Sequence, residues 1–150
     1  MTVSIGLGSE GRSSHIHSRV YGFELLLDLQ GCDSELFNRP YIDQYFTDLC
    51  KLIDMEKCDV HFWDDVGVPV DERQTLPHAK GTSAVCFILT SSIVIHTLDL
   101  LEAVFVNIFS CKSFDPKVAE KFTRERFAAD FSSMRFVERR LLSQHSRDTS

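Results

Sequence analysis

Three apolar runs stand close together near the middle of the chain, and they constrain the fold more than any other feature. They span residues 83–89, 93–97 and 103–110, with polar breaks at 90–92 and around Asp99. Each run is rich in the β-branched and aromatic residues that favour strands, and each break is short enough for a turn. The sequence therefore predicts an antiparallel meander of three strands.

Segments with helical and strand-like patterns flank this meander. Asn38 and Pro40 suit a helix start, and apolar residues recur at helical spacing from there to residue 53. Asp115-Pro116 opens a second helical pattern. Further strands are predicted at residues 23–29, 59–63 and 134–137. Antiparallel strands with two interspersed helices predict an α+β fold, a two-layer α/β sandwich with an antiparallel sheet and helices on one face.

A single domain is expected from the size of the chain. Its 150 residues are 43% hydrophobic, which is enough to bury one core. Residues 1–19 are rich in Ser, Gly, His and Arg without apolar periodicity, so they are predicted to form a mobile N-terminal extension. The domain is predicted to cover residues 20–138, and residues 139–150 to form a flexible C-terminal tail.

Charge and hydropathy exclude several classes of protein. The formal net charge is −6, without the basic stripe that nucleic-acid binding requires. No apolar run approaches the roughly 20 residues that span a bilayer, and the N-terminus lacks a signal sequence. We therefore expect a cytoplasmic protein that binds neither nucleic acid nor membrane. Its five cysteines lack the spacing of a disulfide scaffold, so reduced thiols are predicted at Cys32, Cys50, Cys58, Cys86 and Cys111.

Four polar residues stand at fixed distances in the meander. Ser91 lies five residues before His96, Ser83 lies thirteen residues before it, and Cys111 lies fifteen residues after it. In this spacing the chain resembles the proenzymes of prokaryotic S-adenosylmethionine decarboxylases, which are pyruvoyl-dependent. The resemblance covers roughly residues 20–129, and it is weaker outside the meander. Taken alone, each residue reads as a turn serine or a core side chain, and only the joint spacing favours catalysis.

The resemblance implies a self-cleaving enzyme. The Ser91 hydroxyl would attack the carbonyl of Thr90 and convert the peptide bond to an ester that undergoes β-elimination. Ser83 and His96 would assist rearrangement and proton removal, and Ser91 would become a pyruvoyl cofactor at the start of the second chain. Ser92 is rejected as the nucleophile only because its offset to His96 does not match.

The implied reaction is decarboxylation of an amino-acid-type substrate. The pyruvoyl carbonyl would form a Schiff base with the substrate amine and accept the electron pair that carbon dioxide leaves behind. Cys111 would return a proton to the substrate α-carbon. Adjacent strands can bring His96 and Cys111 together beside the Ser91 turn, although the sequence does not define the register.

Substrate identity stays open at this point. Relatives carry an aromatic residue, a proline and a glutamate after the His-Thr pair, where this chain has Leu98, Asp99 and Leu100. S-adenosylmethionine, used for spermidine synthesis, is the first candidate, and L-ornithine or L-arginine is the alternative. Four acids are candidates for pairing with a distal cation of the substrate: Asp64, Asp65, Asp99 and Glu102.

Other interpretations remain beside this one. The chain could be an inert, unprocessed regulatory homologue. A thiol hydrolase built on Cys111 and His96 lacks an orienting third group. Cys58 and His61 lie three apart in a predicted strand and so face opposite sides, which argues against a metal site. The family resemblance and the uncovered sheet face imply a homodimer.

Overall fold

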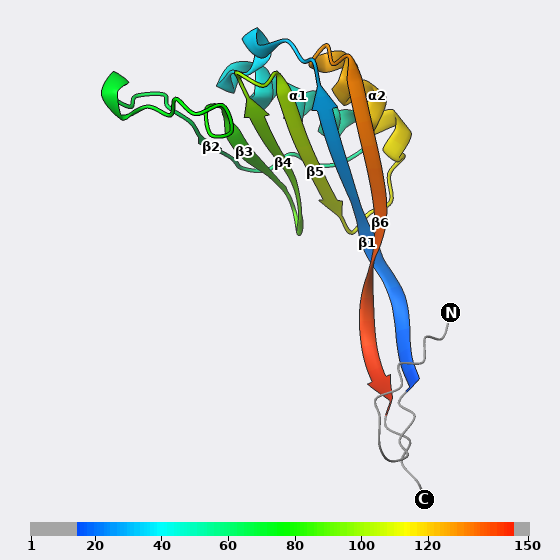
Figure 1. The fold of residues 1–150 in the computed structure, drawn as a ribbon. Coiled ribbons are helices and arrows are strands. Elements are labelled where there is room, and N and C mark those ends of the chain that lie inside the picture. Colours follow the sequence, from blue (N-terminus) through cyan, green and yellow to red (C-terminus); the bar gives the residue numbers. More distant parts are fainter. Residues whose placement is uncertain (1–14, 146–150) are drawn as a thin grey trace, which may run out of the picture.

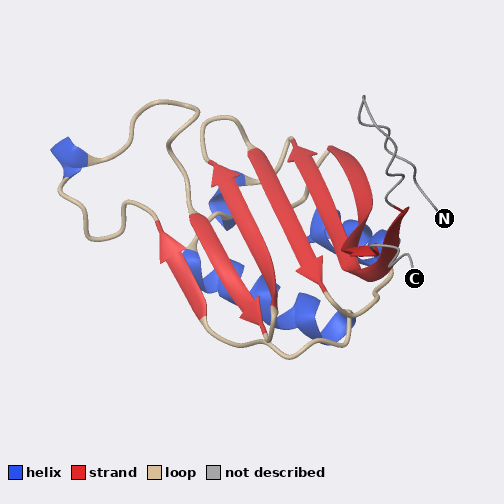
Figure 2. Cartoon of the chain, turned by 90° about the horizontal axis from the view of Figure 1, so that it is seen from below, coloured by secondary structure: helices blue, strands red, loops and turns tan. Residues whose placement is uncertain are grey.

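The computed structural model describes residues 15–145, which form one antiparallel sheet with two helices packed on a single face (Figures 1 and 2). The strand order is β2-β3-β4-β5-β1-β6. The strands are β1 (His15–Gln30), β2 (Val60–Trp63), β3 (Ser83–Ile88), β4 (Ser91–Leu98), β5 (Ala103–Ser110) and β6 (Phe131–His145). The helices are α1 (Arg39–Leu52) and α2 (Pro116–Arg126), with short 3₁₀ turns at Ser34–Leu36 and Val70–Glu72. The predicted α+β sandwich and its central meander are confirmed.

Both helices begin where the sequence predicts. The Asn38 side chain accepts a hydrogen bond from the Tyr41 amide at 3.0 Å, and Asp115 accepts from the amides of Lys117 and Val118. Each cap satisfies amides that have no partner inside the helix. A proline that suits the first turn follows two residues after Asn38 and one residue after Asp115.

The core lies between the sheet and the helices. Alternation along β1 turns Leu25, Leu27 and Leu29 toward the helices, and Ile93 and Ile95 of β4 share that face. Each such side chain contributes about 1.5–3 kcal/mol by leaving water. The helices pack against this face with fully buried apolar residues: Ile42, Tyr45, Phe46, Leu49, Ala119 and Phe127.

The other face of the sheet carries no helix in the described part of the chain (Figure 2). Aromatic side chains stand there exposed, among them Phe87 and Phe105. Near the centre of this face, Glu24 accepts a hydrogen bond from Asn107 and pairs with Arg139. The open face therefore carries exposed aromatic side chains beside a hydrogen-bonded polar group.

The predicted N-terminal extension and C-terminal tail both reach too far into the domain. Residues 15–19 belong to β1 and residues 139–145 belong to β6, and the two strands pair from His15 to Gln30 as a long ribbon that extends past the sheet (Figure 1). Ladder hydrogen bonds use the backbone, so these polar segments form strands without apolar periodicity. The rest of the predicted extension and tail, residues 1–14 and 146–150, lies outside the described residues.

A long connection links β2 to β3 and projects away from the sheet (Figure 1). Its root is tied to α1, where Arg39 makes two hydrogen bonds to the carboxylate of Asp64, at 2.8 and 2.6 Å. Neither helix in the described range is long and apolar enough to cross a membrane.

Candidate active site

The hairpin between β3 and β4 carries the first part of the site. Ile88 pairs with Ser91, so the loop consists only of Leu89 and Thr90. The turn is thus shorter than the predicted break at 90–92, because Ser91 and Ser92 already belong to β4. Leu89 has a φ of 56°, in the left-handed region that residues with a Cβ rarely adopt. The Thr90–Ser91 peptide bond lies one residue after Leu89.

Ser91 and Cys111 meet beside this turn. The Cys111 amide donates to Oγ of Ser91 at 3.2 Å, and the Ser91 hydroxyl donates to Sγ of Cys111 at 3.7 Å. Thr90 Oγ1 lies 3.8 Å from the same sulfur. These hydrogen bonds, with that of Ser91 the largest cause and that of Thr90 the next, hold the pKa of Cys111 below its ordinary value. The hydrogen bonds thereby stabilise the thiolate form of Cys111 next to the predicted nucleophile, Ser91, which is only 6% exposed.

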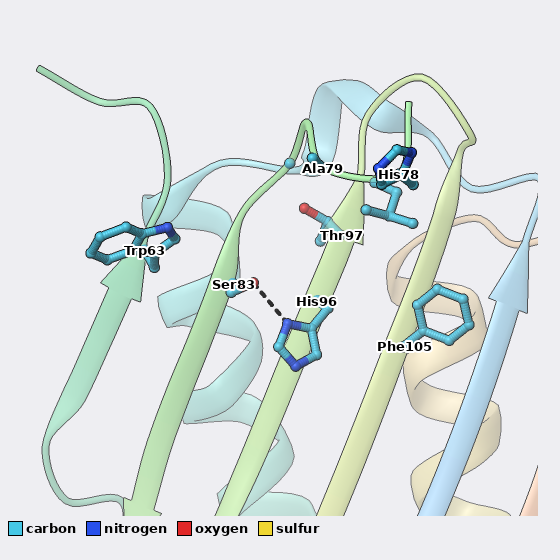
Figure 3. Close-up of a pocket in the computed structure, with 9 residues that line it drawn as sticks. Trp63, His78, Ala79, Ser83, His96, Thr97 and Phe105 are labelled. Carbon is cyan, nitrogen blue, oxygen red and sulfur yellow. Dashed lines mark hydrogen bonds between the residues drawn. The ribbon is translucent and has the colours of Figure 1, made fainter. Parts of the chain in front are cut away.

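Ser83 and His96 form a second pair. Oγ of Ser83 lies 2.7 Å from Nδ1 of His96, on neighbouring strands and on the open face of the sheet (Figure 3). A cavity of about 300 Å³ surrounds the pair, and Trp63, His78 and Phe105 contribute to its wall. Nδ1 is hydrogen-bonded to the serine, which leaves Nε2 for contact with a ligand.

One chain does not bring the two pairs together, so the expectation that His96 and Cys111 converge beside Ser91 is wrong. In the observed register Ser92 pairs with Phe109 and His96 pairs with Phe105. Cys111 therefore lies at the end of the sheet where β4 begins. His96 is five residues further along β4, a distance of about 16 Å, and it points to the opposite face from Ser91.

The four candidate substrate acids occupy different environments. Asp64 is paired with Arg39, and this hydrogen bond is the main reason that its pKa is lowered. Asp65 accepts from the Gln74 amide within the long connection. Glu102 lies exposed in the turn before β5, with a φ of 48°. The structure does not bring these carboxylates to the Ser83–His96 cavity.

Asp99 differs from the other three acids. Its Oδ1 is buried and has no hydrogen-bond partner among residues 15–145, and burial is the main cause that raises its pKa. It lines a second cavity of about 900 Å³, together with Asp64, Asp65 and Arg39. Gly81 borders both cavities, so the two cavities adjoin. Asp99 lines the second cavity and His96 lines the first.

Sequence reasoning missed the aromatic wall of the smaller cavity. Trp63 ends β2 and is 83% exposed, His78 belongs to the long connection, and Phe105 pairs with His96 across β4 and β5. An exposed tryptophan beside a polar pair is a signal of a binding surface. The sequence could have indicated that Trp63 lies beside the Ser83–His96 pair only if the pairing of β2, β3 and β4 had been known.

The fold has a relative of known structure. The crystal structure of the adenosylmethionine decarboxylase from Aquifex aeolicus VF5 matches with a TM-score of 0.64 at 19% sequence identity. The match covers 87% of this chain and 99% of that one. At this identity the likeness establishes the fold. Among curated protein sequences none matches the chain.

The sequence model described as S-adenosylmethionine decarboxylase matches residues 23–140, which is most of the chain. Together with the fold, this match defines the class of protein as a pyruvoyl-dependent carboxy-lyase. The chain belongs to the S-adenosylmethionine decarboxylase family. Members of this family use a pyruvoyl group that they make from their own chain.

Proposed function

We propose that the chain cuts itself between Thr90 and Ser91, that Ser91 becomes the pyruvoyl group, and that the processed enzyme decarboxylates S-adenosylmethionine for spermidine synthesis. The contact of the Ser91 hydroxyl with both the amide and the thiol of Cys111 carries this proposal. A hydroxyl becomes a nucleophile when one neighbour fixes its oxygen and another takes its proton. Cys111 supplies both groups.

Self-cleavage begins with attack of Oγ of Ser91 on the carbonyl carbon of Thr90. The O–C bond forms, the peptide C–N bond breaks and the released amine gains a proton, so the peptide becomes an ester. Removal of the α-proton of Ser91 then breaks the bond between Cβ and Oγ of Ser91. Residues 1–90 leave with Oγ as part of a terminal carboxylate. Loss of ammonia and uptake of water leave a ketone at residue 91.

The surroundings of Ser91 fit this product. Ser91 begins β4, which stays hydrogen-bonded to β3 on one side and β5 on the other, so the new chain start would keep its place in the sheet. When formed, the pyruvoyl group supplies a carbonyl that binds the substrate amine and accepts the electron pair left by carbon dioxide. The Cys111 thiol is then placed to deliver a proton to the substrate α-carbon.

A second copy of the chain completes the site in this proposal. Ser83 and His96 are about 16 Å from Ser91 within one chain, and they stand near the other end of β4. Two sheets packed open face to open face, related by a two-fold axis, would bring the His96 end of one chain to the Cys111 end of the other. His96 of one copy would then remove the α-proton at Ser91 of its partner.

The open face supports such pairing. It presents exposed Phe87 and Phe105, and aromatic side chains of this kind are enriched in protein–protein interfaces. His96 and Cys111 are both exposed as well. A homodimer would bury these groups in a closed site from which water is largely excluded.

The smaller cavity favours S-adenosylmethionine as the substrate. Trp63 and Phe105 offer flat aromatic surfaces near the Ser83–His96 pair (Figure 3). Aromatic rings bind both a flat nucleobase, by stacking, and a sulfonium, by cation–π attraction. These rings compensate for the aromatic residue that Leu98 replaces.

A second candidate substrate is favoured by Asp99. Its unpartnered, buried oxygen would gain a partner from the distal cation of ornithine or arginine. Carbon dioxide release should therefore be measured with all three substrates, in the wild type and in Asp99→Asn. Turnover of S-adenosylmethionine that persists in Asp99→Asn supports the first candidate. Turnover only of ornithine or arginine, lost in Asp99→Asn, supports the second.

A mass measurement distinguishes an active enzyme from an inert regulatory homologue. Intact-mass spectrometry of the purified protein should find fragments 1–90 and 91–150, and Ser91→Ala should remain whole. A single unmodified wild-type chain after prolonged incubation would overturn the proposal. We place the reaction in the cytoplasm, in one domain, because Cys111 acts as a free thiol and a reducing compartment keeps it so.

A further inference from the structure

The turn before the proposed cleavage point is held in an unfavourable conformation. Leu89 has a φ of 56°, and the residue is 73% exposed. The left-handed region is costly for a residue with a Cβ, and burial of the leucine does not compensate here. A two-residue hairpin favours a positive φ at its first loop position, and a contact from outside the hairpin adds to this preference.

Cys58 makes such a contact. The Leu89 amide donates a hydrogen bond to Sγ of Cys58 at 3.4 Å, and the thiol in turn lies 3.8 Å from the carbonyl oxygen of Glu56. Two backbone hydrogen bonds fix Cys58 against β3. Its amide donates to the Phe87 carbonyl at 2.8 Å, and the Phe87 amide donates to the Asp59 carbonyl at 2.9 Å. The sulfur is thus held at the turn by a segment that is hydrogen-bonded to β3.

We infer that Cys58 is a positioning residue for self-cleavage, because it holds the Leu89 amide and with it the turn that presents the Thr90–Ser91 bond to the Ser91 hydroxyl. This inference rests on the proposed function. Cys58 contacts neither the scissile bond nor Ser91 in the structure, so it acts through Leu89. A free turn would spend more of its time in conformations in which Thr90 no longer faces the nucleophile.

The expected effect follows from the loss of one hydrogen bond to an exposed turn. Cys58→Ala should slow self-cleavage about fivefold, which corresponds to about 1 kcal/mol at 1.36 kcal/mol per tenfold change. Cys58→Ser keeps an acceptor on the same side chain, so its rate should lie closer to that of the wild type. Leu89→Gly should restore much of the rate in the Cys58→Ala background, since glycine adopts a positive φ without a Cβ penalty.

The test is a pulse-chase of the full-length chain in a cell-free translation mixture. Fragments 1–90 and 91–150 are quantified against time for the wild type, Cys58→Ala, Cys58→Ser and the double variant C58A/L89G. The matched control is C58A/E102G, because Glu102 is another left-handed residue, with a φ of 48°, in a turn away from the cut. It should not restore the rate. Rescue by Leu89→Gly alone is a result that a general loss of stability would not produce.

The outcomes separate the inference from the function on which it rests. Absence of both fragments in the wild type would overturn the proposed self-cleavage itself. A wild type that cleaves while Cys58→Ala cleaves equally fast would overturn only the role of Cys58. Slow cleavage in Cys58→Ala that neither Cys58→Ser nor Leu89→Gly improves would also overturn it, since the cysteine would then serve stability alone.

Discussion

Replacing Cys111 separates the two duties that the geometry assigns to it. In Cys111→Ala the backbone amide still donates to Oγ of Ser91, as it does at 3.2 Å in the wild type, but the sulfur that receives the hydroxyl proton is gone. Loss of a positioned proton acceptor lowers a rate by about 10²–10⁴-fold, and retention of the amide contact favours the lower end of that range. We expect self-cleavage to slow about a hundredfold and decarboxylation of the processed fraction to fall at least as far.

The same assignment predicts how the rate of self-cleavage changes with pH. The hydrogen bonds from Ser91 and Thr90 lower the pKa of Cys111, so the accepting thiolate persists to a lower pH than for an ordinary cysteine. The wild-type rate should be constant above that pKa and fall as the pH drops through it. Cys111→Ala should lose this inflection.

The assay is cleavage followed by intact-mass spectrometry across a series of pH values, with Cys32→Ala as the control. Cys32 is a buried cysteine outside both residue pairs, so its variant should keep the wild-type inflection. A Cys111→Ala variant that cleaves at the wild-type rate, with the same dependence on pH, would refute the assignment of the thiol as proton acceptor.

Three further predictions concern the scaffold and the cavity. Asp64→Asn should lower the free energy of unfolding by about 1 kcal/mol at neutral pH, because it breaks the pair with Arg39. The pKa of Asp64 is depressed in the folded state, so this stabilisation is present above the unfolded pKa and is lost as the pH falls through the folded one. Urea unfolding at pH 7 and at strongly acidic pH should therefore differ between variant and wild type only at pH 7. Tyr45→Phe removes the buried 2.9 Å hydrogen bond to Thr123 and should cost about 1 kcal/mol in the same assay, and an unchanged midpoint would contradict this. Trp63→Ala should raise the KM for S-adenosylmethionine up to about tenfold while self-cleavage proceeds at the wild-type rate; an unchanged KM would remove Trp63 from the substrate site.

The sequence predicts the parts of this fold that depend on local chemistry. The caps at Asn38 and Asp115 and the three-strand meander are where side-chain type and spacing place them. The ends of β1 and β6 were not predictable in the same way. Residues 15–19 and 139–145 carry no apolar alternation, and they form strands because each is the pairing partner of the other.

The candidate site shows a similar division. The residue types and their offsets are visible in the sequence, and the structure places Ser91 in contact with Cys111 and Ser83 in contact with His96. The separation of the two pairs was not visible, because it depends on the register of β4 against β5, and a single-residue slip would change both the partner and the face of every side chain.

Complementation between two inactive variants tests the central claim most directly. Ser91→Ala and His96→Ala chains with different tags are produced separately and together, and the fragments of each are identified by mass. In a mixed dimer, one site combines Ser91 and Cys111 of the His96→Ala chain with the intact Ser83 and His96 of its partner. We predict that co-production restores cleavage of the His96→Ala chain between residues 90 and 91, while the Ser91→Ala chain stays whole. Cleavage of the His96→Ala chain that is no faster in the presence of its partner than alone would contradict a site shared between two copies.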